Sequence, residues 1–145
     1  MSSDSRPMTI TLNYDHGDGY FAPYFEHLMQ GRPLASLCPK CDAAWFPPAP
    51  TCPNDGAETI WHEIDTQGRI VSLTRTRSRL PFADGVGDHT FVLVLMDEAV
   101  NAVLGRLRDD DGEIGPGARV ELSTPVEPVA HPAQAVRFKA LQAAE

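Results

Sequence analysis

The stretch that decides the fold reads Leu37-Cys38-Pro39-Lys40-Cys41 and, after ten more residues, Cys52-Pro53-Asn54-Asp55-Gly56. The first part is a CxxC turn, and the second repeats its spacing with an aspartate where the second cysteine would stand. Two residues between ligands allow a tight turn to direct both side chains at one ion, and two such turns complete a tetrahedron. The spacing predicts a metal-binding ribbon over residues 34–63, with the ligands Cys38, Cys41, Cys52 and Asp55.

Three thiolates and one carboxylate form a set that a structural zinc ion accepts, with the Asp oxygen at about 2.0–2.2 Å. Because oxygen is a harder ligand than sulfur, the affinity should fall below that of a four-thiolate site. Two alternatives stay open. Asp55 leaves the site weakly filled or empty, or His62 or water completes the coordination. No residue beside the cluster supplies a catalytic base, so the pattern favours a structural ion and no catalytic residues.

Composition excludes several classes of protein. The 145 residues include 12 basic and 20 acidic side chains, for a net charge of −8, and this acidity opposes binding to nucleic acid phosphates. No apolar run approaches the ~20 residues that span a bilayer, and the first eight residues lack the features of a signal peptide. Three cysteines clustered between positions 38 and 52 suit metal binding in a reducing compartment. We expect a cytoplasmic protein with no nucleic acid or membrane partner.

An aromatic helix is expected within residues 20–33, after a flexible arm of residues 1–19. Its apolar residues follow a helical spacing and form one stripe: Phe21, Tyr24, Phe25, Leu28 and Met29. Gly31 and Pro33 then end the helix. Two interpretations stay open. The stripe packs on its own domain, or it docks on a partner through the aromatic anchors that interfaces favour.

The pattern becomes β from Gly68 onward. Thirteen prolines and eleven glycines leave little room for long helices. Expected strands cover residues 70–74 with alternation to 79, 91–96, 102–107, 118–122 and 135–141. The continuous apolar run 91–96 is typical of a central strand buried on both faces. Five short strands over about 75 residues predict a small barrel over residues 64–145. The fold class is therefore mainly β.

The order of these motifs resembles a family of small proteins in which a rubredoxin-like zinc ribbon precedes an OB-fold, long labelled only a domain of unknown function. The resemblance covers residues 20–141. Beyond the two paired-ligand turns it rests on Gly31-Arg32-Pro33-Leu34, Phe46-Pro47-Pro48, Gly68-Arg69-Ile70-Val71-Ser72-Leu73-Thr74 and Arg137-Phe138-Lys139. Asp55 departs from the usual fourth cysteine of the family, which bears on the metal more than on the ribbon.

The resemblance implies an accessory role in acyl-CoA chemistry. Members of this family accompany a thiolase-like enzyme, such as a thiolase, a ketoacyl synthase, an acetyltransferase or an aldolase of the lipid-transfer-protein type. They have no catalytic apparatus of their own. We therefore expect a noncatalytic subunit of a hetero-oligomer that holds such an enzyme and helps it bind acyl-CoA.

Three arginines, Arg75, Arg77 and Arg79, alternate along one extended stretch and point to the same side if it is a strand. Guanidinium groups pair well with phosphates, so this face could contact the anionic part of CoA. The alternative is a solvated edge that discourages aggregation between strands.

Two rival functions stay open. One is a single-strand nucleic-acid binder that uses the barrel groove, which the net charge opposes. The other is a rubredoxin-like redox protein with iron in the ribbon. The sequence has no GxxxxGK loop, GxSxG elbow or HExxH helix, so it offers no motif of a common enzyme class.

Overall fold

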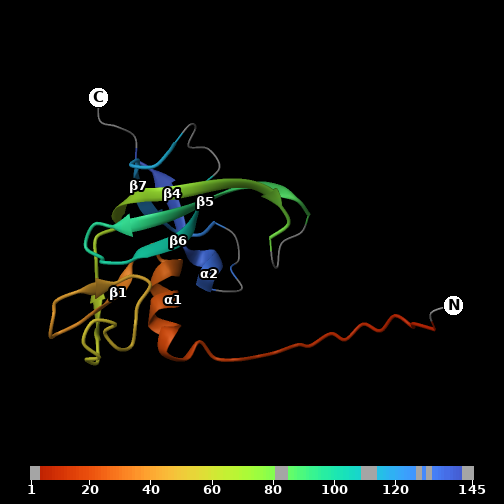
Figure 1. The fold of residues 1–145 in the computed structure, drawn as a ribbon, viewed down its shortest axis with the longest axis horizontal. Helices are drawn as coiled ribbons and strands as arrows, with labels where there is room; N and C mark the ends of the chain where they lie inside the picture. The colour runs from red at the N-terminus through yellow and green to blue at the C-terminus, as the bar shows by residue number, and fades with distance from the viewer. Residues whose placement is uncertain (1–3, 81–84, 109–113, 127–128, 130–131, 142–145) are drawn as a thin grey trace.

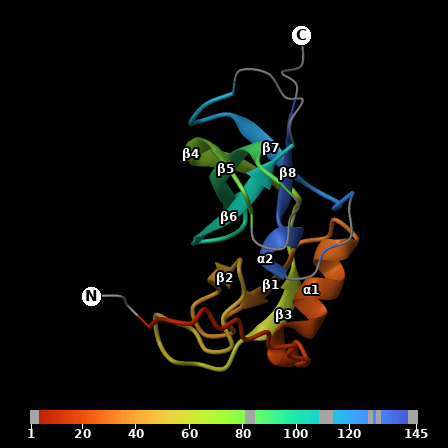
Figure 2. The ribbon, with the colours of Figure 1, turned by 90° about the vertical axis from the view of Figure 1, so that its right-hand side faces the viewer.

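A three-stranded ribbon sheet lies below a five-stranded closed barrel, with a helix beside the ribbon (Figures 1 and 2). The computed structural model describes residues 4–80, 85–108, 114–126, 129 and 132–141. The described elements are η1 (Gly19–Phe21), α1 (Ala22–Met29), β1 (Leu34–Leu37), β2 (Ala44–Trp45), β3 (Ile60–Glu63), β4 (Gln67–Ser78), β5 (Gly87–Met96), β6 (Ala102–Leu107), β7 (Arg119–Ser123), α2 (Pro132–Ala135) and β8 (Arg137–Ala140). The predicted mainly-β fold is confirmed. None of the described helices is long and apolar enough to span a membrane.

Helix α1 begins and ends where the sequence indicates. Pro23 lies in the first turn, where its missing N–H is tolerated, and Gly31 adopts a positive φ of 69° just beyond the last turn. Arg32 then donates from Nε and Nη2 to the two carboxylate oxygens of Glu63, at 2.8 and 2.7 Å. This bidentate pair ties the end of α1 to β3.

The aromatic stripe of α1 faces mainly the protein itself. Tyr24 and Leu28 are buried, and Phe25 and Met29 pack against the core, because α1 lies against β1 and α2. Phe21 is 41% exposed. Of the stripe that was a candidate for docking on a partner, Tyr24 and Leu28 are thus covered by this protein itself.

Phe46 is fully buried and joins α1 to the ribbon. Its ring lies 5.6 Å from the ring of Tyr24, in an edge-to-face arrangement. Strand β1 is central in the ribbon, between β2 and β3, and both pairings are antiparallel. Ser36, buried in β1, accepts a hydrogen bond at its Oγ from the backbone N–H of Ala49 at 2.9 Å, so this core hydroxyl is satisfied.

The barrel closes in the order β4-β5-β6-β8-β7, with β7 pairing back to β4. Among the described strands only β6 and β8 pair in parallel, and this order is that of an OB-fold. Its interior holds mostly branched side chains around one aromatic ring: Ile70, Val92, Val94, Val103, Val120 and Phe138. Gly105 is required beside that ring, because a Cβ at this position would lie 2.6 Å from Phe138.

Strand β5 differs from the prediction in one respect. The run 91–96 was expected to be buried on both faces, but only Val92, Val94 and Met96 are buried. The alternate residues, Phe91 among them, are half-buried on the outer wall, because a barrel covers each strand on one face only. The β4–β5 hairpin also continues past the barrel wall, where Arg77 pairs with Asp88 (Figure 1).

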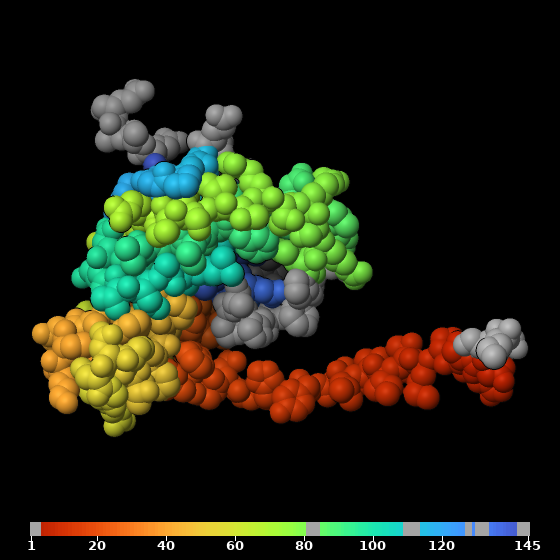
Figure 3. All heavy atoms as spheres, viewed as in Figure 1, coloured from red at the N-terminus to blue at the C-terminus, as the bar shows by residue number. Residues whose placement is uncertain are grey.

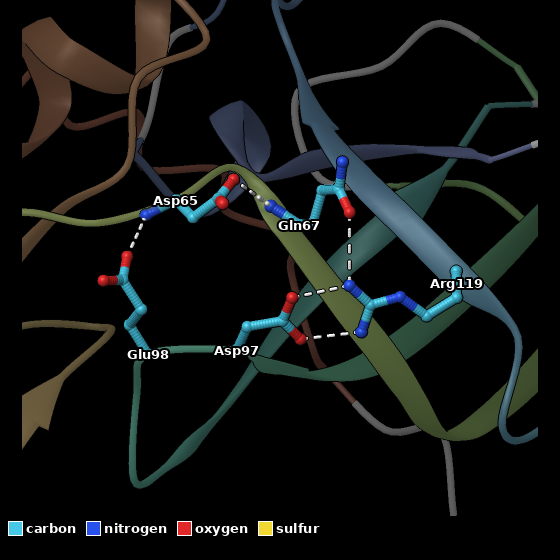
Figure 4. Close-up of polar contacts among 5 residues, drawn as sticks. All are labelled: Asp65, Gln67, Asp97, Glu98 and Arg119. Carbon is cyan, nitrogen blue, oxygen red and sulfur yellow. Dashed lines mark hydrogen bonds and ion pairs between the residues drawn. The ribbon is translucent and has the colours of Figure 1, made fainter.

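The turn between β5 and β6 fixes the ribbon to the barrel. The backbone N–H of Val100 donates to the carbonyl of Ala44 at 2.9 Å, and that of Phe46 donates to Oδ1 of Asn101 at 2.7 Å. In the same turn Glu98 accepts a hydrogen bond from the backbone N–H of Asp65, which lies in the linker between β3 and β4 (Figure 4). The two sheets are therefore joined by direct hydrogen bonds as well as by the chain.

Asp97 and Arg119 form a bidentate ion pair at this junction, with Arg119 donating at 2.7 and 2.5 Å (Figure 4). The hydrogen bonds from Arg119 lower the pKa of Asp97. A lowered pKa stabilises the fold above the ordinary pKa of about 3.9, and this contribution is lost as the pH falls through the lowered value.

Asp97→Asn is therefore expected to lower the melting temperature slightly at neutral pH, because the pair is half exposed and screened by solvent. The difference from the unmodified protein should shrink on acidification from about pH 5 to pH 2. Thermal melts of both proteins across this range test the prediction. A difference that stays constant or grows towards acid pH would contradict it.

Candidate metal centre

Two turns of matching geometry build the cysteine cluster. In the first, the N–H of Asp42 donates to the carbonyl of Cys38 at 2.9 Å, and in the second the N–H of Gly56 donates to that of Cys52 at 2.8 Å. The residue after each turn has a positive φ, 59° at Asp42 and 74° at Gly56. Glycine and aspartate are among the residues that adopt this conformation most readily. The sequence thus builds the same turn twice.

The four predicted ligands lie together. The Sγ atoms of Cys41 and Cys52 are 3.7 Å apart, and the Sγ of Cys38 lies 3.5 Å from each carboxylate oxygen of Asp55. One ligand atom from each of the four residues lies within 4.8 Å of all the others. Around a tetrahedral zinc ion, two sulfurs should be about 3.8 Å apart and a sulfur and an oxygen about 3.5 Å apart. The side chains therefore fit one tetrahedral ion.

The carboxylate of Asp55 is held in place by its own turn. Its Oδ1 accepts a hydrogen bond from the backbone N–H of Ala57 at 2.9 Å, and this bond lowers the pKa of Asp55. Burial raises the pKa of the Cys38 thiol to about 11 when no metal is bound. Asp55 rather than His62 completes the cluster, so the structure does not favour the alternative in which His62 is the fourth ligand.

A partly exposed aromatic group lies beside α1: Tyr20 and Phe21 are exposed, and Trp61 is half-buried. We call these three residues the aromatic surface. The rings of Tyr20 and Trp61 stack at 4.7 Å, and Tyr20 meets Phe21 edge-on at 5.1 Å. Tyr20 is 38% exposed. Sequence reasoning found Phe21 but missed its two neighbours, since no local pattern connects β3 with the start of α1.

The arginine stretch lies on the part of β4 that leaves the barrel. Arg75 and Arg77 alternate along the strand and share a face, as predicted, and Arg79 directly follows β4. Arg77 pairs with Asp88 at 3.2 Å, and Arg75 donates from Nη2 to the backbone carbonyl of Ile114 at 3.1 Å. Arg75 and Arg77 therefore already have protein partners, and both stay exposed.

Comparisons with known proteins agree with this architecture. Residues 25–60 match the family described as ChsH2, rubredoxin-like zinc ribbon domain. A chain of an Ltp2-ChsH2(DUF35) aldolase is similar in structure, with a TM-score of 0.63, 19% identity and coverage of 88% of this chain and 98% of that chain. A DUF35-family protein of unknown function from Sulfolobus solfataricus has a TM-score of 0.60, 17% identity and coverage of 88% and 89%.

No curated protein sequence matches the chain. The resemblance drawn from the motifs is confirmed by the ribbon match and by the structural neighbours. Residues 25–60 thus match a rubredoxin-like zinc ribbon, a closed barrel follows it, and the chain shares the fold of these two DUF35 structures.

Proposed function

We propose that this chain is a noncatalytic accessory subunit that binds a thiolase-like acyl-CoA enzyme, such as a thiolase, an acyltransferase or an aldolase. The observation that carries the proposal is the match of ribbon, helix and barrel together to nearly the whole of a chain from an Ltp2-ChsH2(DUF35) aldolase. The likeness concerns the fold, and the surfaces described above suggest how such a subunit would act.

The metal centre supports a structural role. Cys38, Cys41, Cys52 and Asp55 supply four ligand atoms, the full set for a tetrahedral zinc ion. A catalytic zinc ion needs a position open to water or substrate, and this set leaves none. We infer that a zinc ion bound here would fix the two turns and, through them, the loop that carries Phe46.

The aromatic surface is the proposed docking site. Aromatic side chains are enriched among the residues that dominate binding energy at interfaces. Tyr20 and Phe21 are partly exposed and already held in place by ring contacts, so little side-chain freedom would be lost on binding. The rest of the stripe positions them, because Tyr24 and Leu28 anchor α1 in the core.

Replacing both Tyr20 and Phe21 with alanine is expected to weaken binding to the thiolase-like enzyme by about 30-fold or more, the effect of losing an interface hot spot. The melting temperature should change little, because both side chains are partly exposed. Co-expression with a thiolase-like enzyme, followed by size-exclusion chromatography and calorimetry, provides the measurement.

A matched control is Val71→Ala, which removes an exposed apolar side chain from the outer wall of the barrel. The control should bind normally. Undiminished binding by the Tyr20/Phe21 variant would place the interface elsewhere. If the unmodified chain does not bind the enzyme with or without acyl-CoA, the proposed function is wrong.

Arg75 and Arg77 share one face of β4, which we call the arginine face. It is the proposed contact for the phosphates of acyl-CoA. Replacing Arg75 and Arg77 with alanine should weaken CoA binding to the complex by about 10-fold, with a smaller effect at high salt because exposed charges are screened. The matched control is Arg69→Ala, on the same strand but opposite Leu95 of the outer wall. Equal losses in both variants would show only a general effect of charge, and no loss in either would exclude the arginine face.

A further inference from the structure

The arm before α1 carries large apolar side chains that the protein leaves uncovered. Met8, Ile10, Leu12 and Tyr14 are between 74% and 85% exposed. The arm extends away from the rest of the molecule (Figures 1 and 3). Among the described residues, no backbone group of residues 4–17 is hydrogen-bonded to the ribbon or the barrel. Both the side chains and the backbone of this segment are therefore available to a partner.

The arm has the sequence of a half-buried strand. Its apolar residues recur at every second position, whereas Thr9, Thr11 and Asn13 occupy the positions between them. Residues 8–14 contain no charge, proline or glycine, and threonine, isoleucine and tyrosine favour strands. In an extended conformation the apolar side chains share one face. This pattern suits a strand that lies at the edge of a sheet with one face covered.

A second copy of this chain offers a poor acceptor edge. Past Arg69, β4 pairs with β5 alone among the described strands, so residues 71–78 leave one edge open, but most side chains along it are polar or charged and would not cover the apolar face of the arm. The outer strands of the ribbon, β2 and β3, have two and four residues and cannot pair with a seven-residue strand along its length. The net charge of −8 also makes copies of the chain repel one another. Both observations favour an acceptor edge on a different protein.

We propose that residues 8–14 add as a strand to an exposed sheet edge of the thiolase-like enzyme, with the four apolar side chains in a groove beside that edge. Backbone hydrogen bonds would supply affinity and the alternate side chains would fix the register. Gly17 and Gly19, between the arm and α1, allow the arm to turn towards the edge. This inference rests on the proposed function, because it assumes that the enzyme is the partner.

Hydrogen exchange of the full-length chain, alone and with the co-expressed thiolase-like enzyme, tests the inference directly. Residues 8–14 should exchange rapidly in the free chain and at least about 100-fold more slowly in the complex. The matched variant swaps two pairs of neighbouring residues by four substitutions, Ile10→Thr, Thr11→Ile, Leu12→Asn and Asn13→Leu, and we call it the swapped variant. It keeps the composition and breaks the alternation, so it should bind at least about 10-fold more weakly.

The outcomes separate this inference from the proposed function. If the complex forms but residues 8–14 are not protected from hydrogen exchange, or the swapped variant binds normally, the strand addition is wrong and the accessory role stands. If the free chain is a dimer with a protected arm, the occupant is a second copy and the inference is overturned. If no complex forms, both are wrong.

Discussion

Cys52→Ala is expected to remove the bound zinc ion and to destabilise the ribbon. Cys52 is buried, its thiol lies 3.7 Å from that of Cys41, and it supplies one of the four ligand atoms of the cluster. Structural zinc contributes about 10–16 kcal/mol in isolated zinc-finger peptides. Here α1 and the barrel also support the ribbon, so we expect a smaller loss, of about 3 kcal/mol or more, and a melting temperature lower by about 10 °C.

Elemental analysis and thermal melting of the purified chain give the measurement. Asp55→Cys is the matched variant, because it supplies the missing thiolate and should raise zinc affinity by about 10-fold or more. If Cys52→Ala keeps its zinc, or if neither variant changes the metal content, the cluster is not the zinc site. The unmodified protein with a strong chelator added should give the same melting curve as the Cys52→Ala variant.

Phe138→Ala should be the most destabilising change in the barrel. Phe138 is fully buried in β8, and its ring lies against the backbone at Gly105. Removing a buried phenylalanine ring costs about 3–5 kcal/mol, from lost burial and from the cavity left behind. In a domain of this size the melting temperature should fall by about 10 °C or more.

The matched control for Phe138→Ala is Phe91→Ala. It removes the same side chain from the outer wall of β5, where Phe91 is only half-buried. We expect a loss of about 1 kcal/mol from this control, measured by urea unfolding. Equal losses in the two variants would mean that the barrel interior is not the main source of stability.

The local features were predictable from the sequence because each depends on a short spacing. The two paired-ligand turns, the stripe of α1 and the expected strand over residues 102–107 were placed correctly. Each is defined by a repeat of three or four residues in helices and turns or of two residues in strands. Asp55 was identified from its position alone, and the structure places its carboxylate next to the three thiols.

The features that were missed depend on contacts between distant segments. Trp61 stacks on Tyr20, and Asn101 accepts a hydrogen bond from the backbone of Phe46, yet neither pair has a sequence pattern. The apolar run containing Phe91 was expected to be buried on both faces. A continuous apolar run is compatible with a central strand buried on both faces and with a barrel strand that has one outer face. Only the closure of the barrel decides between the two.

The pattern of the arm is visible in the sequence, yet the sequence predicts only a flexible arm over residues 1–19 and does not distinguish a functional segment from a linker. Its alternation from Met8 to Tyr14 becomes informative only once the structure shows that these side chains have no cover within the described residues. The exposure of a strand-like segment thus adds what periodicity alone cannot, namely that no described part of this chain covers its apolar side chains.

The most direct test is the turnover of an acyl-CoA thioester by the isolated chain, by the thiolase-like enzyme and by the two together. A noncatalytic subunit with a fully coordinated metal predicts no turnover by the chain alone, and a change in the activity or CoA affinity of the enzyme when the chain is added. Turnover by the isolated chain, retained after Cys52→Ala, would contradict the accessory role.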